Sequence, residues 1–261
     1  MSDVTDAVFR RMIAKYGKPD VMWTEFVSAD GLCSAGKNKL LHQLVFSEKE
    51  RPIVAQLFGA KSETMRRAAA IVAKLGFDGI DINMGCPDRA VEKQGGGAAL
   101  MKNPKLAREI IRAAKRGAEK LPVSVKTRIG YNKNELTTWL PELLAEAPAV
   151  IIIHARTRKE LSNVPARWEH IREAVVIRDR LKSKTLIIGN GDVADFADAY
   201  EKAKKSGADG IMIGRAFFGK PWLLSNSSRF NLYRRLKILL EHTKLSDKLL
   251  GKHKSFVVMK K

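Results

Sequence analysis

Short apolar runs rich in valine and isoleucine recur along the chain, and each is followed by polar residues or glycine and then by a longer segment with helical apolar spacing. Alternation of this kind indicates parallel strands joined by helices. The pattern predicts seven strands, at residues 21–26, 52–58, 79–83, 123–129, 149–154, 185–189 and 210–214.

Several helices have residues that suit their ends. Ser62 suits the start of a helix that ends at Gly76, and Asn103 followed by Pro104 suits the start of a helix through Arg116. Residues 195–205 form a similar segment that begins at an aspartate and ends before Ser-Gly. Because strands and helices alternate without a low-complexity linker, residues 1–224 are predicted to form one domain.

The alternation predicts an α/β fold, a TIM (β/α)8 barrel. Such a barrel needs eight strands, and the chain begins in a helical segment, residues 5–16, so we expect the barrel to lack its first strand. Residues 231–240 are basic and helical in pattern. We therefore expect residues 225–261 to be the beginning of a small, incomplete C-terminal helical domain.

Polar residues follow the predicted strands at their carboxyl ends, where the catalytic groups of parallel barrels lie. Taken singly, each can be explained as satisfying backbone groups or crossing the barrel mouth. Lys126 and His154, however, interrupt apolar strands where a charge or an imidazole is costly without a partner. A site is therefore predicted at this rim, from Gln56, Asn83, Cys86, Lys126, Arg128, His154, Arg156, Asn190, Gly191, Asp192, Gly214 and Arg215.

The last two strands are expected to hold a phosphate, because their loops form the usual phosphate cradle of such barrels. Gly191 and Gly214 allow close approach of the backbone, and Arg215 adds positive charge. The alternative is that these glycines only permit tight turns. We interpret the loops as the site of a phosphorylated cofactor.

Cys86 lies on a turn between Gly85 and Pro87, where an exposed thiol can act as an acid or a nucleophile. Cys33 has no flanking basic or imidazole group and is interpreted as an inert small hydrophobe. The glycine-rich segment that starts at Lys93 lacks the spacing of a nucleotide P-loop and is interpreted as a mobile substrate loop.

The formal net charge is +20, from 48 lysines and arginines against 28 acidic residues, which favours a polyanionic partner. The alternative is a basic surface that binds no ligand. Two cysteines are too few for a disulfide scaffold, and the sequence shows neither a secretory leader nor an apolar run of membrane-spanning length. We expect a cytoplasmic monomer without a membrane or an obligate protein partner.

The chain resembles the bacterial tRNA-dihydrouridine synthases, flavoenzymes that reduce uridine in tRNA. The resemblance covers nearly the whole chain, and its most specific part is Asn-Met-Gly-Cys-Pro together with Lys-Gln-Gly-x-Gly. The family's barrel opens with a strand that precedes the first residue here, and the family ends in a helical tRNA-binding domain. The matching segments are 3–6, 9–10, 55–57, 81–87, 93–100, 126–128, 154–157, 189–192 and 214–216.

The resemblance implies FMN across the barrel mouth, with NADPH as its reductant and no metal. Gln56, Lys126 and His154 would surround the flavin ring, and a second group would lie near its ribityl and phosphate groups. Cys86 would donate a proton to C5 of the uracil after hydride transfer to C6. The second group is Asn190, Gly191, Asp192, Gly214 and Arg215. The implied contacts to the tRNA substrate are Asn83, Arg128, Arg156 and Lys93.

Three other functions are compatible with parts of the sequence. An FMN barrel oxidoreductase acting on a small molecule such as dihydroorotate would share the phosphate cradle and the lysine, but would not explain the charge or the cysteine turn. An aldolase-like barrel would use Lys126 as a Schiff-base amine. A catalytically silent protein would bind RNA through its basic surface alone.

Overall fold

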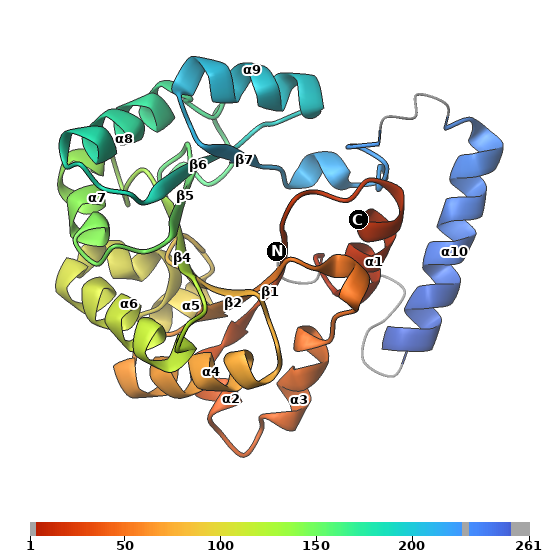
Figure 1. Ribbon diagram of the computed structural model, residues 1–261, viewed down its shortest axis with the longest axis horizontal. Coiled ribbons are helices and arrows are strands. Elements are labelled where there is room, and N and C mark those ends of the chain that lie inside the picture. Colours follow the sequence, from red (N-terminus) through yellow and green to blue (C-terminus); the bar gives the residue numbers. More distant parts are fainter. Residues whose placement is uncertain (1–3, 226–229, 252–261) are drawn as a thin grey trace.

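Seven parallel strands form one sheet in which each strand pairs with the next in chain order (Figure 1). The computed structural model describes residues 4–225 and 230–251. All seven predicted strands are confirmed, with ends that differ by at most two residues. The strands are β1 (Met22–Ser28), β2 (Ile53–Phe58), β3 (Gly79–Asn83), β4 (Val123–Arg128), β5 (Val150–His154), β6 (Leu186–Asn190) and β7 (Gly210–Met212).

Helices surround the outer face of the curved sheet, so the predicted α/β barrel fold is confirmed (Figure 1). Among the described residues β1 and β7 are the two edges of the sheet, and no strand lies between them. The α-helices are α1 (Ala7–Tyr16), α2 (Ala29–Leu32), α3 (Asn38–Leu41), α4 (Ser62–Lys74), α5 (Arg89–Lys93), α6 (Pro104–Ala118), α7 (Leu136–Leu144), α8 (Glu169–Arg180), α9 (Phe196–Ser206) and α10 (Leu232–Leu250). Short 3-10 turns are η1 (His42–Leu44), η2 (Glu48–Glu50), η3 (Gly97–Lys102) and η4 (Arg215–Phe217).

Two of the predicted helix starts are confirmed by side-chain caps. Asn103 accepts a hydrogen bond from the backbone of α6, and Asp195 does the same for α9. The predicted cap at Ser62 is wrong, because Ser62 is already the first helical residue of α4. Lys61 occupies the cap position and makes no side-chain cap hydrogen bond.

The core lies between the sheet and the helices around it. Ile80 and Ile82 of β3, Val125 of β4, and Ile151 and Ile153 of β5 are completely buried. Residues two apart on a strand point to the same face. These five therefore leave the alternate positions of the same strands to face the barrel interior, where the polar residues of β3, β4 and β5 lie.

The last described helix packs against the first, as Figure 1 shows for α10 and α1. Glu241 accepts hydrogen bonds from Lys15 Nζ at 2.6 Å and from Tyr16 Oη at 2.5 Å. The rings of Trp222 and Phe230 stack with their centroids 4.6 Å apart. The predicted helix at 231–240 is real but longer. A separate domain from residue 225 stays a prediction, and residues 226–229 and 252–261 lie outside the described part.

Within residues 4–225 and 230–251, no helix is both long enough and apolar enough to span a membrane.

Replacing Gly117 with alanine is expected to lower the free energy of unfolding by about 2 kcal/mol, because overpacking a tight helix contact is costly. An added Cβ would lie 2.0 Å from the carbonyl oxygen of Arg66, where α6 crosses α4. Urea denaturation measures the change. The matched control is Gly36→Ala, where the nearest atom to the added Cβ is Ser34 Oγ at 3.4 Å. Equal stability of the two variants would contradict the close packing of α4 on α6.

Candidate active site

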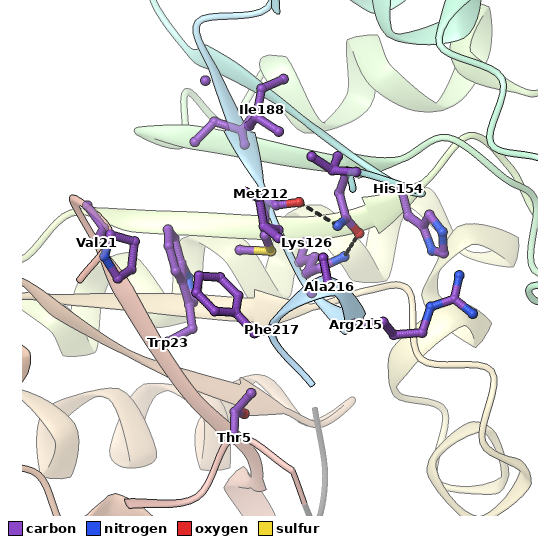
Figure 2. Close-up of a pocket in the computed structure, with 18 of the residues that line it drawn as sticks. Thr5, Val21, Trp23, Lys126, His154, Ile188, Met212, Arg215, Ala216 and Phe217 are labelled. Carbon is purple, nitrogen blue, oxygen red and sulfur yellow. Dashed lines mark hydrogen bonds between the residues drawn. The ribbon is translucent and has the colours of Figure 1, made fainter. Parts of the chain in front are cut away.

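A cavity of about 810 Å³ opens at the carboxyl ends of the strands. Figure 2 shows Lys126 and His154 directed into it, with Arg215 nearby. The cavity continues to the open edge of the sheet, where Trp23 and Met212 line it. Arg156 and Lys93 are not among its lining residues. The predicted site residues that line the cavity are Gln56, Asn83, Cys86, Lys126, Arg128, His154, Asn190, Gly191, Asp192, Gly214 and Arg215.

The turn that carries Cys86 is anchored by three separate segments. Asn83, the last residue of β3, accepts hydrogen bonds through Oδ1 from the backbone N–H of Gly85 at 3.1 Å and of Cys86 at 2.9 Å. Arg128 Nε donates to the carbonyl oxygen of Gly85 at 2.8 Å. The N–H of Ala98 donates to the carbonyl oxygen of Cys86 at 2.9 Å. The position of the thiol is therefore fixed through the backbone that carries it.

Burial raises the pKa of the Cys86 thiol, and the nearby Asp88 and Glu92 carboxylates act in the same direction. Its side chain is only partly buried and lines the cavity. A thiol whose pKa lies above its ordinary value is protonated at neutral pH, so it suits proton donation better than nucleophilic attack. Cys33 does not line the cavity, and its Sγ contacts the carbonyl oxygen of Thr64 at 3.4 Å.

A buried carboxylate lies behind the cavity wall, and sequence reasoning did not assign it to the site. Asp81 of β3 is completely buried, and burial raises its pKa to about 6. Its Oδ2 accepts a hydrogen bond from Gln56 Nε2 at 2.6 Å, and its Oδ1 accepts one from Ser124 Oγ at 2.5 Å. The signal was an aspartate in the middle of an apolar strand, where a charge needs partners.

Lys126 projects from β4 into the cavity and is tied to the last two strands. Its Nζ donates to Asn190 Oδ1 at 3.0 Å, and Asn190 Nδ2 donates to the carbonyl oxygen of Met212 at 2.8 Å. Burial and the nearby Arg128 lower the pKa of Lys126 to about 8, while Asp81 opposes the shift. The ammonium group is therefore charged at neutral pH but close to its titration.

His154 is a neutral imidazole in this site. Burial, together with the positive charges of Lys126, Arg128 and Arg156, lowers its pKa to about 2. Its Nε2 lies 3.0 Å from Nη1 of Arg156. An arginine can only donate, so Nε2 accepts and the ring proton is on Nδ1. His154 can therefore donate one hydrogen bond through Nδ1 without carrying a charge.

Arg156 is placed inside the wall and not in the cavity. Its Nε donates to the carbonyl oxygen of Val164 at 2.5 Å, Nη1 contacts His154, and Nη2 pairs with Asp192. The predicted contact of Arg156 with the substrate stays a prediction, but in this structure the side chain orients His154 and Asp192. Arg156 contributes most to holding the pKa of Asp192 at about 2.

The residues of the predicted phosphate cradle come from two loops, and their binding of phosphate stays a prediction. Gly191 has a φ of 128°, and an added Cβ would lie 2.8 Å from Ala166 Cβ and 3.1 Å from His154 Cδ2, so the position requires glycine. Arg215 Nη2 donates to Asp192 Oδ1 at 3.0 Å. Because Arg156 also pairs with Asp192, the local charge is one net positive unit.

The glycine-rich segment that starts at Lys93 makes specific contacts with its surroundings. Lys93 is exposed and ends α5, a short helix capped by Asp88, and Glu92 of this helix pairs with Arg158. An added Cβ at Gly97 would lie 2.7 Å from the carbonyl oxygen of Cys86. The segment thus forms a short helix and a 3-10 turn. Its interpretation as a mobile substrate loop stays a prediction, as does contact of Lys93 with a substrate.

Arg128 lines the cavity, but its guanidinium also holds the rim together. Its Nη1 donates to the carbonyl oxygens of Thr157 and Leu161, both at 3.0 Å, in addition to the contact with Gly85. Burial lowers its pKa to about 10. The side chain therefore remains charged at neutral pH and lies close to the Cys86 turn.

Fold and site together define an α/β-barrel enzyme with a cofactor-sized cavity at the carboxyl ends of its strands. Similar folds occur in morphinone reductase in complex with tetrahydroNAD (TM-score 0.54, 14% identity, 85% of this chain and 81% of that chain) and in a variant of NCR from Zymomonas mobilis (TM-score 0.52, 18% identity, 92% and 82%).

The family is shown by the sequence itself. The model of the dihydrouridine synthase (Dus) family matches residues 1–257. A probable tRNA-dihydrouridine synthase of Staphylococcus aureus (strain COL) is 43% identical over 251 residues, which are 95% of this chain and 76% of the relative. The probable tRNA-dihydrouridine synthase 2 of Bacillus subtilis (strain 168) is 43% identical over 250 residues, with the same coverage. The chain belongs to the dihydrouridine synthase family.

Replacing Lys126 with methionine is expected to raise the free energy of unfolding at pH 7 by about 1 kcal/mol, because the cost of burying a charge disappears. The gain should shrink between pH 8 and 10.5. Across that range Lys126 is already neutral in the folded protein, because its pKa there is about 8, but it is still charged in the unfolded chain. Urea denaturation at pH 7 and pH 10 measures the difference. Lys74→Met, at an exposed position, is the control. A loss of stability at pH 7 would contradict the expectation.

Proposed function

We propose that this chain reduces the C5–C6 double bond of uridines in tRNA to 5,6-dihydrouridine. The observation that carries the proposal is a thiol, Cys86, on an anchored turn at the rim of a cavity that is also lined by Lys126, His154 and Gln56. Family membership supports the substrate, since the curated relatives are described as probable tRNA-dihydrouridine synthases. Family membership also argues against an aldolase that uses Lys126 as a Schiff-base amine.

The lining residues fit a flavin mononucleotide. The cavity of about 810 Å³ lies within the usual range for cofactor sites. The indole Nε1 of Trp23 is buried in the lining without a hydrogen-bond partner, and such a donor suits a polar ligand atom. Gln56, Lys126 and His154 would hold the ring, with the phosphate end held by Asn190, Gly191, Asp192, Gly214 and Arg215.

When bound, FMN reduced by NADPH would supply the hydride to C6 of the uracil. Cys86 Sγ then gives its proton to C5, which leaves a thiolate. Arg128 lowers the pKa of Cys86 electrostatically and so stabilises that thiolate, against the desolvation that raises the pKa. The thiol is protonated before the reaction and has a cation nearby afterwards, as a general acid requires.

The substrate uridine has to leave its stack to enter the cavity, because a folded tRNA cannot approach a barrel mouth with a stacked base. We assign the contacts to the uracil edge to Asn83 and Arg128, which line the cavity. Lys93 is exposed beside the Cys86 turn and is assigned to phosphate. Arg156 acts on the substrate through His154. The cytoplasm, where tRNA is found, is the compartment that we propose.

Cys86→Ala is expected to reduce dihydrouridine formation by about 10²-fold or more, because a general acid contributes that much to a rate. Reduction of the bound flavin by NADPH should stay within twofold, since the thiol takes no part in it. Mass spectrometry of tRNA digests measures the first quantity, and bleaching of the flavin absorbance measures the second.

The matched control is Cys33→Ala, which removes the thiol that does not line the cavity and should leave both rates within twofold. Dihydrouridine formation by Cys86→Ala at the wild-type rate would exclude Cys86 as the proton donor. A purified protein without flavin absorbance would instead remove the basis for FMN.

The tRNA contact is expected to be mainly electrostatic, because the chain carries a net charge of +20. Lys102 and Lys105 are exposed at the start of α6, which follows the carboxyl end of β3 and so lies at the catalytic rim. Replacing both with alanine should lower the slope of log Kd against log salt concentration by about 2. Filter binding of tRNA between about 50 and 200 mM salt measures the slope.

The control for this pair is Lys74→Ala. Lys74 is exposed at the end of α4, which runs back to the amino ends of the strands, so it lies at the opposite rim. Its removal should leave the slope unchanged. An equal effect at both rims would mean that the tRNA has no preferred side of the barrel.

A further inference from the structure

Asp81 has no part in the proposed reaction, yet it is the first member of a series of hydrogen bonds that ends at the backbone N–H of Cys86. The strand register places Asp81 beside Gln56 of β2 and Ser124 of β4, and it places Asn83 beside Lys126. Asp81 and Asn83 are two residues apart on β3, so their side chains share one face. Asp81 does not line the cavity, whereas Gln56 and Asn83 do.

The groups at the two ends of this series of hydrogen bonds determine which atom of each amide donates and which accepts. An ionised carboxylate can only accept, and the backbone N–H groups of Gly85 and Cys86 can only donate. Gln56 Nε2 donates to Asp81 at 2.6 Å, and Asn83 Nδ2 donates to Gln56 Oε1 at 2.9 Å. Asn83 Oδ1 is then left to accept from the two N–H groups of the turn.

Only one orientation of each amide satisfies both ends. If Gln56 were flipped, its carbonyl oxygen would face the carboxylate of Asp81 and its NH2 group would face the NH2 group of Asn83. If Asn83 alone were flipped, its NH2 group would face the N–H groups of the turn. Each alternative brings like groups together in a buried place, which costs the free energy of unsatisfied polar groups.

We propose that Asp81 is a positioning residue that sets the orientation of the Gln56 and Asn83 amides and, through Asn83, the place of the Cys86 turn. The proposal rests on the proposed function for its catalytic meaning, but the geometry of the thiol can be tested without it.

The same series of hydrogen bonds determines which ligand atoms the cavity wall can recognise. One N–H of Gln56 and one N–H of Asn83 remain after the internal hydrogen bonds are made, and Asn83 Oδ1 already accepts two. Both residues therefore offer donors to the cavity. Carbonyl oxygens are the matching groups on a ligand, and both the flavin pyrimidine ring and uracil carry them.

The test compares Asp81→Ala with Asp81→Asn in the full chain. The alanine variant leaves Gln56 without an acceptor, so the amides can turn and the Cys86 turn loosens. The asparagine variant keeps an acceptor for Gln56. Its NH2 group can donate to Ser124 Oγ, whose own hydrogen can turn to the carbonyl oxygen of Ile80 at 3.4 Å.

The first measurement is the rate of alkylation of Cys86 by iodoacetamide, followed by peptide mass spectrometry so that Cys33 serves as an internal control. We expect Asp81→Ala to alkylate Cys86 at least threefold faster than the wild type, Asp81→Asn to stay within 1.5-fold, and Cys33 to be unchanged in both. An unchanged rate in the alanine variant would overturn the proposal, and so would an equal increase in the asparagine variant, because charge alone would then be responsible.

The second measurement is dihydrouridine formation per bound flavin. We expect Asp81→Ala to lose at least tenfold in kcat with the KM for tRNA within twofold, and Asp81→Asn to restore kcat to within threefold of the wild type. A general loss of structure would lower the kcat of both variants and would not be rescued by asparagine. If the wild type forms no dihydrouridine, the proposed function fails, and the alkylation rates still decide the role of Asp81.

Ser124→Ala provides a second variant if Asp81→Ala does not fold. It removes one of the two donors to Asp81 and leaves the carboxylate free to turn away from Gln56. We expect Cys86 to be alkylated about twofold faster in this variant. A rate of Cys86 alkylation equal to that of the wild type would contradict the proposal that Asp81 positions the Cys86 turn.

Discussion

The site depends on the in-register parallel pairing of the strands. Parallel pairing sends the carboxyl ends of β3 to β6 to one rim and aligns residues of adjacent strands across the sheet. Asn83 stands beside Lys126, Arg128 beside His154, and His154 beside Asn190. A shift of one residue in any pair would turn the polar set of that strand into the apolar layer under the helices. The convergence of polar groups is thus a consequence of the same register that buries Ile82 and Ile153.

Charge burial in this site is handled by different means at different positions. His154 gives up its charge altogether, because it is buried and three cations lie nearby, and Lys126 keeps its charge at neutral pH with a pKa lowered to about 8. Asp81 is stabilised by two donors, which explains why its pKa rises only to about 6 in spite of complete burial. Asp192 has two arginine partners and stays ionised. The charge states of these residues in and behind the cavity wall therefore depend on one another.

Sequence reasoning found the strands because apolar residues such as Ile80, Ile82, Ile151 and Ile153 follow the strand period, and it found the rim because polar residues interrupt that period at carboxyl ends. It could not tell which polar groups face the cavity and which face one another. Arg156 was assigned to the substrate, but three of its nitrogens are engaged inside the wall. Such pairing depends on distances between strands, which a linear pattern does not contain. The Ser62 cap failed for a related reason, because a residue suited to a helix start can equally be the first helical residue.

The surroundings of position 86 suit a thiol better than other acids for the proton donation that we propose. An ammonium group at position 86 would lie near Arg128, and burial together with that charge would lower its pKa, as burial and Arg128 lower the pKa of Lys126. A carboxylic acid would pair with Arg128 and be ionised before the substrate arrived. A thiol in a partly buried place stays neutral because burial raises its pKa. It acquires charge only when its proton has gone, and at that moment Arg128 becomes a favourable neighbour. The arginine that anchors the turn through Gly85 therefore also favours a thiolate at Cys86, the state that the proposed proton transfer would leave.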